Sequence, residues 1–317
     1  MRRLFPVTDE TAAPAPDQAR EAPAAGPAGA EREWSLDELA AAYAYPERTP
    51  APATAPAPAS GAGPASGAAS ASGAALGAAS GAGAVAGDLP AGPSAEPRAW
   101  LRANMVSTLD GAAQHDGRSQ PISNAADMRI FGTLRALADV VLVGAETVRQ
   151  EGYRPARARA EFAARRAAAG QTPAPAVAVV SAGLDLDFSL PLFTAPLVPT
   201  LILTGAAAPR DRIAAAEKAG ARVLIAGDGA GVEPARAVRA LAELGHTRLL
   251  TEGGPRLLGQ LVAAGVLDEL CLTVAPMLTA GAAQRIAGGP SVAVPSRFAL
   301  VSLLEEDGFL FSRYRRA

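Results

Sequence analysis

Cysteine and histidine are scarce in this sequence, and their scarcity excludes several kinds of site. Cys271 is the only cysteine among 317 residues, which excludes an internal disulfide and any zinc site built from several cysteines. It lies in the apolar run Leu270–Leu272, where a packed and inert thiol is favoured over a reactive one. The two histidines, His115 and His246, lack the spacing of a metal pair. We therefore expect no bound metal, and a single cysteine fits the reducing cytoplasm.

Long hydrophobic runs and an excess of one charge are also absent. The formal net charge is -2, which gives no electrostatic footprint for nucleic acid or an anionic membrane surface. No apolar run is long enough to span a bilayer. The start Met1-Arg2-Arg3 leads into Pro6 and Asp9 rather than an apolar segment, so it does not resemble a signal peptide. We expect a soluble, cytoplasmic protein that binds neither nucleic acid nor membrane.

The first hundred residues offer little that can pack. Residues 1–33 are rich in Ala, Pro and charge and predict a disordered tail. Residues 47–97 are Pro/Ala and Gly/Ala/Ser repeats, which predict a disordered linker because they bury too little apolar surface. Between them, residues 34–46 predict a short amphipathic helix, since Ser35 and Glu38 have the spacing of a capping box. Two interpretations stay open: a transient helix, or one that docks on the domain.

Residues 98–317 alternate strand patterns with helix patterns. Strands are predicted at 103–107, 139–143, 176–180, 200–203, 222–225, 248–250 and 270–274. Helices are predicted at 124–138, 210–219, 233–244 and 256–264. This alternation predicts an α/β domain with a mostly parallel sheet and helices on both faces. Residues 298–304 and 309–314, around a turn at 305–308, predict a C-terminal β-hairpin at an antiparallel edge.

Two glycine turns follow buried strands and precede predicted helices. Gly144 ends one strand, and the free N–H groups of the next helical turn, near Thr147, favour a phosphate. Gly253-Gly254 ends another, with Pro255 at the first helical position. A glycine after a strand is also common in ordinary turns that have no binding role. Two such turns in one sheet favour a dinucleotide site, because open α/β sheets bind ligands at the carboxyl ends of their strands.

Polar residues gather along and after the first predicted strand of the domain: Asn104, Ser107, Asp110, Arg118, Ser123 and Asp127. Asn104 and Ser107 lie on opposite faces of that strand. Polar side chains in a buried strand need partners, and a ligand is one way to supply them. Asp127, three residues after Asn124, equally fits a helix-capping arrangement. Because no nucleophile–base pair stands out, hydride transfer by a cofactor suits the sequence.

Three segments resemble the NADPH-dependent pyrimidine reductases of riboflavin biosynthesis, which share the dihydrofolate-reductase-like fold. They are Asn104–Gly111 (NMVSTLDG), Val143–Val148 (VGAETV) and Thr251–Leu258 (TEGGPRLL), in the family's order within residues 98–317. The resemblance is to a stand-alone, actinobacterial-type member. Bifunctional members also carry a zinc deaminase, whose His-x-Glu and Pro-Cys-x-x-Cys motifs this sequence lacks, so we expect no deaminase activity.

The resemblance implies transfer of a hydride from NADPH to the ribose C1′ of 5-amino-6-(5-phosphoribosylamino)uracil, by a homodimer to which strand 269–276 contributes. It implies catalytic roles for Asp110 and Glu252. On the substrate side it implies Asn104, Ser107, Arg118, Arg135, Glu151 and Arg154. On the cofactor side it implies Ser123, Asp127, Gly144, Ala145, Thr147, Val148, Gly205, Glu252, Gly253, Gly254, Pro255, Leu257 and Leu258.

Two departures from the family leave the substrate open. Many bacterial members have lysine where this chain has Asn104, and Asp-Asp-Pro where it has Glu151–Tyr153. A second hypothesis therefore keeps fold and cofactor but takes a pterin or dihydrofolate-like ring. A third is a non-catalytic, cofactor-binding scaffold whose 34–46 helix recruits a partner. A Rossmann dehydrogenase is disfavoured, because the first strand leads to Asp110-Gly111 rather than to G-x-G-x-x-G.

Overall fold

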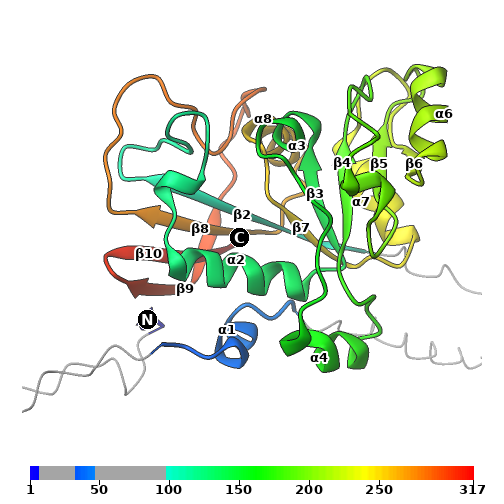
Figure 1. Cartoon of the computed structure of the whole chain (residues 1–317). Coiled ribbons are helices and arrows are strands. Elements are labelled where there is room, and N and C mark those ends of the chain that lie inside the picture. Colours follow the sequence, from blue (N-terminus) through cyan, green and yellow to red (C-terminus); the bar gives the residue numbers. More distant parts are fainter. Residues whose placement is uncertain (7–32, 47–97) are drawn as a thin grey trace, which may run out of the picture. The chain divides into compact units, whose positions relative to one another are not determined.

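The structure, a computed structural model, describes residues 1–6, 33–46 and 98–317. The rest of the predicted tail and the predicted linker lie outside these residues. The described strands form one sheet in the order β1-β9-β10-β8-β2-β7-β3-β4-β5-β6 (Figure 1). The strands are β1 (Arg2–Phe5), β2 (Trp100–Thr108), β3 (Val140–Gly144), β4 (Ala176–Val180), β5 (Leu201–Thr204), β6 (Arg222–Ile225), β7 (Arg248–Thr251), β8 (Glu269–Ala275), β9 (Phe298–Glu306) and β10 (Phe309–Arg316). The α-helices are α1 (Leu36–Ala42), α2 (Ala125–Leu137), α3 (Ala145–Gln150), α4 (Ala163–Ala168), α5 (Pro191–Thr194), α6 (Arg210–Lys218), α7 (Pro234–Glu243) and α8 (Pro255–Ala263).

The strand directions confirm a mostly parallel sheet with a C-terminal hairpin. Strands β8, β2, β7, β3, β4, β5 and β6 run parallel to one another. Strands β10 and β9 form the predicted antiparallel hairpin. Its turn is tighter than predicted, because Asp307 (φ 53°) and Gly308 (φ 78°) alone reverse the chain. As a result β9 continues to Glu306 rather than ending at Leu304.

The outer edge of the sheet differs from the prediction. Residues 2–5, within the span predicted as a disordered tail, form β1 and pair antiparallel with β9. The sequence predicted that the hairpin forms the edge of the sheet. In the structure β1 pairs with β9 and forms that edge instead. Two arginines in a four-residue strand give no clear alternation, and the pairing partner lies about three hundred residues away, so local pattern carried no signal for this strand.

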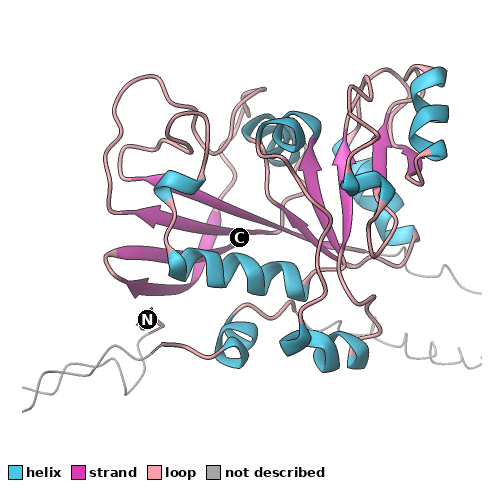
Figure 2. Cartoon of the chain, viewed as in Figure 1, coloured by secondary structure: helices cyan, strands magenta, loops and turns pink. Residues whose placement is uncertain are grey.

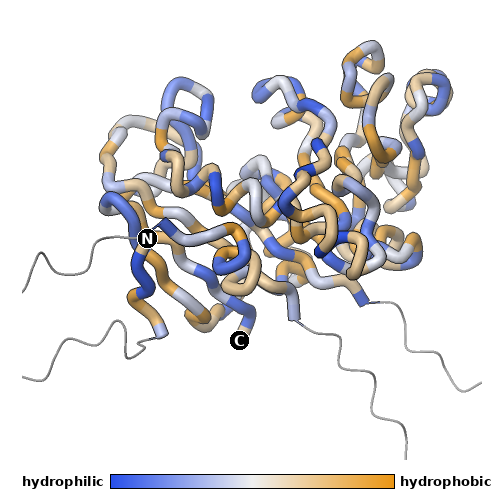
Figure 3. The backbone as a smooth tube through the Cα atoms, turned by 60° about the horizontal axis from the view of Figure 1, so that its bottom comes forward, coloured by the Kyte–Doolittle hydropathy of each residue, from blue (hydrophilic) through white to orange (hydrophobic). Residues whose placement is uncertain are grey.

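Helices cover both faces of the sheet (Figure 2). Alternate residues of β3 explain this, since Val141 and Val143 face one side while Val140 and Leu142 face the other. The first side packs against α1, α2, α5 and α6, and the second against α7 and α8. Figure 3 shows both hydrophobic and hydrophilic stretches throughout the described part of the chain. None of the described helices has the length and apolarity needed to cross a membrane.

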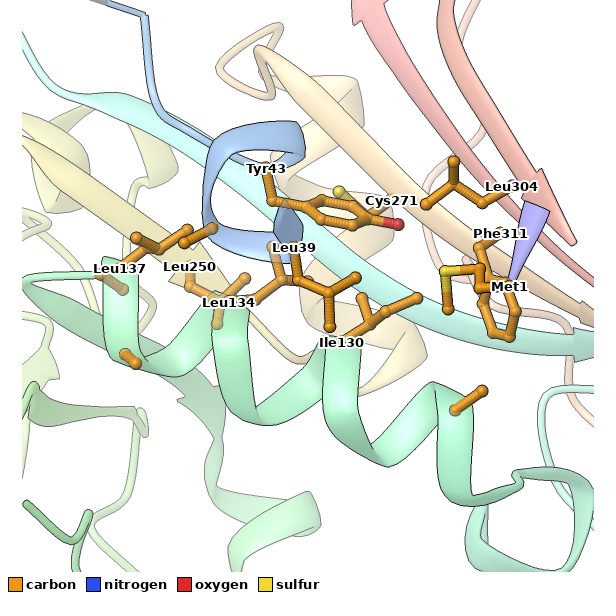
Figure 4. Close-up of a cluster of buried hydrophobic side chains, with 14 of the residues drawn as sticks. Met1, Leu39, Tyr43, Ile130, Leu134, Leu137, Leu250, Cys271, Leu304 and Phe311 are labelled. Carbon is orange, nitrogen blue, oxygen red and sulfur yellow. The ribbon is translucent and has the colours of Figure 1, made fainter. Parts of the chain in front are cut away.

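Helix α1 docks on the domain, which decides between the two interpretations left open above. The predicted capping box is present, because Ser35 Oγ accepts from the Glu38 N–H at 3.2 Å and Glu38 accepts from the Ser35 N–H at 2.9 Å. Leu39 and Tyr43 are buried in one cluster with Leu134 of α2. Figure 4 shows Leu39 between Tyr43 and α2. This packing does not support a helix held free to recruit a partner.

A buried ionic cluster holds the C-terminal end of α1. Glu269 of β8 pairs with Arg102 of β2 at 2.6 Å and with Arg313 of β10 at 2.7 Å. Arg102 also donates to the Tyr43 carbonyl at 2.7 Å, and Arg313 donates to the Ala42 carbonyl at 2.6 Å. Arg315 also pairs with Glu269, at 3.4 Å, so three guanidinium groups face one carboxylate. The negative end of the helix compensates part of the remaining positive charge.

Cys271 lies beside this cluster. Its side chain is buried, and burial, more than any neighbouring charge, raises the pKa of the thiol to about 12. The predicted packed, inert thiol is confirmed, because thiolate is the reactive form of cysteine.

Candidate active site

The two predicted glycine turns meet at the carboxyl ends of neighbouring strands. β3 and β7 pair in parallel, and the Gly144 N–H donates to the Gly253 carbonyl at 3.0 Å. Gly253 has a φ of 88°, a conformation that favours glycine. At Gly254 a Cβ would lie 2.7 Å from Thr147 Oγ1, so this turn has no room for a side chain. Helices α3 and α8 begin directly after the turns, with Pro255 at the first position of α8, as predicted.

Some residues predicted on the cofactor side turn their side chains away from the surface. Val148, Leu257 and Leu258 are 2%, 7% and 1% exposed and pack into the hydrophobic cores. Ala145 begins α3 and packs against the same core as Val148. The side chains of the three buried residues belong to the hydrophobic cores, because their spacing after each turn is that of core-facing helix positions. Contact with a cofactor at these positions would be made by the backbone.

Gly205 has a structural explanation that the sequence did not suggest. It follows β5, where a Cβ would lie 2.1 Å from the Gly229 carbonyl oxygen. The Ala206 and Ala207 N–H groups bond to Gly227 and Gly229 carbonyls of the loop after β6. Gly205 is thus required by close packing of two loops.

Glu252, Arg135 and Tyr153 form a closed hydrogen-bonded trio beside the turns. Arg135 of α2 donates from Nε and Nη2 to the two oxygens of Glu252, both at 2.6 Å. Nη2 also donates to the Tyr153 hydroxyl at 2.7 Å, and that hydroxyl donates to Glu252. The guanidinium lies 4.3 Å from the Phe131 ring centroid and 5.1 Å from that of Tyr153. A bidentate, ring-stacked arginine fixes the orientation of Glu252.

The protonation states of the trio follow from burial and charge. Burial, and then the charge of Glu252, raise the pKa of Tyr153 well above its ordinary value, so the phenol keeps its proton. Burial alone would lower the pKa of Arg135, but the Glu252 carboxylate outweighs it and raises that pKa. Arg135 and Tyr153 therefore both keep their protons beside Glu252.

Two adjoining cavities open around this trio. The inner cavity, of about 530 Å³, is lined by Asn104, Ser123, Asp127, Phe131 and Glu252 among others. The outer cavity, of about 990 Å³, shares part of that lining. It extends to Thr147, Gly254 and Pro255 on one side and to Arg154, Arg157 and Arg159 on another, with Glu151 lining both cavities. The arrangement connects the glycine turns with the inner cavity and with an arginine-rich segment.

The inner cavity brings together residues that were predicted on opposite sides of the site. Asn104, expected to face substrate, and Ser123 and Asp127, expected to face the cofactor, line the same space. Asn104 Oδ1 is buried and has no hydrogen-bond partner among the described residues. Asn124 caps α2 by accepting from the Asp127 N–H at 2.8 Å, which confirms the predicted cap and leaves the Asp127 carboxylate free for other bonds.

Three of the residues predicted for catalysis or substrate binding lie outside both cavities. Asp110 accepts from Thr108 Oγ1 and from the N–H groups of Thr279 and Ala280, at 3.1 and 2.7 Å, and these hydrogen bonds lower its pKa. It therefore ties its turn to a neighbouring loop, and its position gives no support to a catalytic role.

Ser107 lies on the strand face opposite Asn104, and its hydroxyl donates a hydrogen bond to the Thr108 carbonyl.

Arg118 is the third of these residues. It is exposed in a small turn, where it exchanges backbone hydrogen bonds with His115 at 2.9 and 3.1 Å. Its position therefore does not support contact with substrate. No group of three or more His, Cys, Asp or Glu that could hold a metal occurs in residues 1–6, 33–46 or 98–317.

Sequence reasoning missed several residues that shape the site. Tyr153 stood out only as a departure from a family motif, although its phenol completes the trio. Thr273 received no role, and its hydroxyl donates to Asp127 at 2.6 Å. Gly132 of α2 has no side chain where the Arg159 guanidinium lies, since a Cβ there would be 2.0 Å from Nη1. Only the register of distant strands and helices brings these groups together.

Comparison with known proteins shows the family to which this chain belongs. The RibD C-terminal domain model matches residues 99–307. This chain belongs to the RibD C-terminal domain family. The resemblance drawn from the three sequence segments is therefore confirmed.

Named relatives are similar over the same region. The 2,5-diamino-6-ribosylamino-4(3H)-pyrimidinone 5′-phosphate reductase of Archaeoglobus fulgidus is 26% identical over 69% of this chain and 100% of its own length. The enzyme of that name from Methanothermobacter thermautotrophicus is 30% identical over 58% of this chain and 81% of its own.

Solved structures agree with the fold. A pyrimidine reductase-like protein of Corynebacterium diphtheriae has a TM-score of 0.63 and 27% identity, covering 69% of this chain and 92% of that one. The riboflavin biosynthesis reductase of Saccharomyces cerevisiae shares the fold, with a TM-score of 0.51 and 12% identity over 69% of this chain and 90% of that one.

Proposed function

We propose that this protein is an NADPH-dependent reductase of riboflavin biosynthesis that converts the ribose of a 5-amino-6-(5-phosphoribosylamino)pyrimidine to a ribityl chain. The observation that carries the proposal is the inner cavity, which holds Asn104, Asp127 and Glu252 in its lining and adjoins the paired glycine turns through Glu252. The Archaeoglobus and Methanothermobacter relatives are named for a 2,5-diaminopyrimidinone substrate. The uracil substrate expected from the sequence differs from it at ring position 2.

The turns fit a dinucleotide. Gly144, Gly253 and Gly254 present backbone without side chains, and the gap beside Thr147 is one that a Cβ at Gly254 would fill. No side chain caps α8, so the N–H groups of its first turn are suited to a pyrophosphate. The bound dinucleotide would supply the hydride.

Glu252 is the residue that we place at the reacting sugar. Its two oxygens are held by Arg135, so the carboxyl group is fixed in a position to accept a hydrogen bond from a ribose hydroxyl. Tyr153 is a neutral phenol that donates to Glu252 and holds its orientation. Fixing one acceptor in this way favours a single orientation of C1′ toward the glycine turns.

The arginine-rich segment suits the substrate's 5′-phosphate. Arg154, Arg157 and Arg159 line the outer cavity, and no carboxylate within the described residues pairs with them. Three guanidinium groups beside an opening attract a phosphate dianion. Glu151 lies at the same opening, where its carboxyl group would accept a hydrogen bond from a sugar hydroxyl.

A homodimer in the cytoplasm completes the proposal. Strand β8 is interior to the sheet, but one face of it and its neighbours presents the half-buried apolar residues Leu272, Val274, Leu303 and Leu310. Such an apolar sheet face suits a self-complementary contact.

The experiment is a spectrophotometric assay at 340 nm with both ribotides and with NADPH and NADH in parallel. We expect turnover with NADPH, and a fall in kcat/KM of roughly 100-fold in Glu252→Gln. The matched control is Glu243→Gln, an exposed glutamate at the end of α7, which should leave turnover unchanged. Gly253→Val should weaken dinucleotide binding, because valine disfavours the φ of 88° and pushes backbone from the pyrophosphate. Absence of turnover of either ribotide refutes the proposal.

A pterin-like ring is the second candidate substrate. The observation that favours it is the replacement at Glu151–Tyr153, where Tyr153 adds an aromatic ring next to Glu252. A competition assay between dihydrofolate and the ribotides separates the two, since preference for dihydrofolate would replace the first proposal.

A further inference from the structure

Arg166 of α4 is a buried cation to which the proposed reduction gives no role. The residue is only 2% exposed. Its Nη1 donates to the carbonyls of Ala136 and Ala138, both at 2.8 Å, and its Nε donates to the Thr172 carbonyl at 2.7 Å. Its Nη2 is buried and has no hydrogen-bond partner among the described residues. Because an unsatisfied buried polar group costs free energy, this nitrogen calls for a partner.

Capping of α2 explains only part of this arrangement. Ala136 and Ala138 lie at the C-terminal end of α2, where the negative end of the helix dipole favours a cation. Figure 1 shows α4 beside that end of α2. The cap uses Nη1, and Nε binds the segment that leads to β4. Among the described contacts, none gives Nη2 a structural task.

The positive charge of Arg166 is also left without a carboxylate of its own. Burial lowers the pKa of Arg166, and Asp139 is the carboxylate whose charge opposes that effect. The oxygens of Asp139 are already occupied, because one accepts from Gln171 Nε2 at 2.6 Å. The other accepts from the N–H groups of Thr247 and Arg248, both at 2.8 Å. A buried guanidinium in this setting favours an anionic ligand.

The surroundings of Arg166 indicate which anion fits. Arg166 lines the outer cavity together with Ala136, Pro173 and Pro175. These neighbours are apolar, and the hydrogen bonds of Arg166 go to backbone carbonyls rather than to the trio around Glu252. One positive charge among apolar neighbours matches a single negative charge, because a dianion would leave a buried negative charge uncompensated.

We propose that the part of the outer cavity beside Arg166 binds a small monocarboxylate, at a site separate from those of the ribotide and the dinucleotide. The two N–H groups of Nη2 would donate to the carboxylate in charge-assisted hydrogen bonds. The phosphate dianion of the ribotide is matched instead by the three arginines at 154, 157 and 159. A carboxylate at Arg166 would stabilise the C-terminal end of α2 without touching the reacting groups.

The first test follows the thermal midpoint of the full-length protein as sodium acetate replaces sodium fluoride at constant ionic strength. We expect a saturable rise of roughly 3–6 °C when acetate reaches ten times its Kd. Arg166→Gln should lose this rise, because it removes the charge. The matched control is Arg165→Gln, since Arg165 is the exposed neighbour that pairs with Asp37 at 3.0 Å, and it should keep the rise. No saturable rise in the wild type, or an equal one in Arg166→Gln, overturns the inference.

The second test needs no folded Arg166 variant and no turnover. Saturation-transfer NMR detects binding of propionate to the full-length wild type, with and without saturating ribotide and dinucleotide. We expect the propionate signal to persist in both conditions. Absence of the signal, or its displacement by the ribotide, overturns a separate site. Persistent propionate binding without turnover of either ribotide refutes the proposed function and leaves the carboxylate site standing.

A third variant tests whether the chain supplies its own anion. Glu161 is an exposed carboxylate that lines the same cavity. We expect Glu161→Gln to bind acetate more tightly than the wild type, because a like charge is removed. If Glu161 fills the site in solution, the wild type shows no response to acetate and Glu161→Gln acquires one. That result would replace the proposed ligand with an internal ion pair.

Discussion

Docking of α1 can be tested by truncating one side chain, Leu39→Ala. Leu39 is 0% exposed and lies in the cluster that joins α1 to α2, as Figure 4 shows. Removing three buried carbons from a leucine costs about 2–5 kcal/mol, because the transfer free energy is lost and a cavity remains. We place Leu39→Ala in this range, since its neighbours Tyr43 and Leu134 are themselves buried and have little freedom to fill the space.

The cost should appear in the stability of the whole domain. The carbonyls at the end of α1 accept from Arg102 and Arg313, in β2 and β10, so loosening the helix leaves two buried guanidinium groups with fewer partners. Urea unfolding followed by circular dichroism measures the change in unfolding free energy. The matched control is Leu197→Ala, which removes the same atoms from a side chain that is 62% exposed and should change stability by less than about 0.5 kcal/mol.

The reasoning fails if Leu39→Ala is as stable as the control. An unchanged free energy of unfolding would mean that α1 does not dock in solution, and the hypothesis of a free helix that recruits a partner would return. A lower urea midpoint of unfolding, with an unchanged dependence of the unfolding free energy on urea concentration, would show that α1 docks as part of one cooperative unit.

Three further predictions concern the site and the sheet face. Gly254→Ala should lower the thermal midpoint, because the added methyl group overpacks against Thr147 at a cost of about 1–3 kcal/mol. In a double-mutant cycle, adding Thr147→Ala to this variant should restore most of the lost stability. Because burial raises the pKa of Asp127, its contribution to stability is present below the ordinary aspartate pKa and is lost as pH rises through the raised pKa. The free energy of unfolding of Asp127→Asn should therefore increase relative to that of the wild type over this pH interval. Free energies that change in parallel with pH would contradict this prediction. Leu272→Glu should shift a dimer toward monomer in light scattering without unfolding it, and a wild type that is already monomeric refutes the proposed contact.

Much of the fold was predictable because its signals are local. β4 and β6 begin and end as predicted. β3 and β4 are continuous apolar runs, which identifies strands covered on both faces. The end of α2 nearest the site was also predictable, because Asn124 carries the cap in its own side chain. β1 was not, since its partner is distant in sequence and its four residues have no clear alternation.

The site was only partly predictable, because a resemblance transfers positions and not side-chain partners. Asp110 keeps the family's position, but its oxygens are occupied by Thr108 and two backbone N–H groups. Gly205 follows a strand as Gly144 does, yet loop packing alone explains it. Asp127 was assigned to the cofactor side because nothing in the sequence reveals that β8 brings Thr273 to it. Each difference arises from tertiary contacts between segments far apart in the chain.

The buried ionic cluster that holds the end of α1 and the candidate active site involve the same elements. Arg102, which binds the end of α1, lies two residues before Asn104 on the same face of β2. Tyr45, just after α1, donates to the Leu249 carbonyl on β7 at 3.1 Å, three residues before Glu252. The cluster around Leu39 also includes α2, which carries Arg135 and Asp127. A helix that contacts β2, β7 and α2 limits how these three can move relative to one another, so the segment around residues 34–46 belongs to the machinery that positions the site.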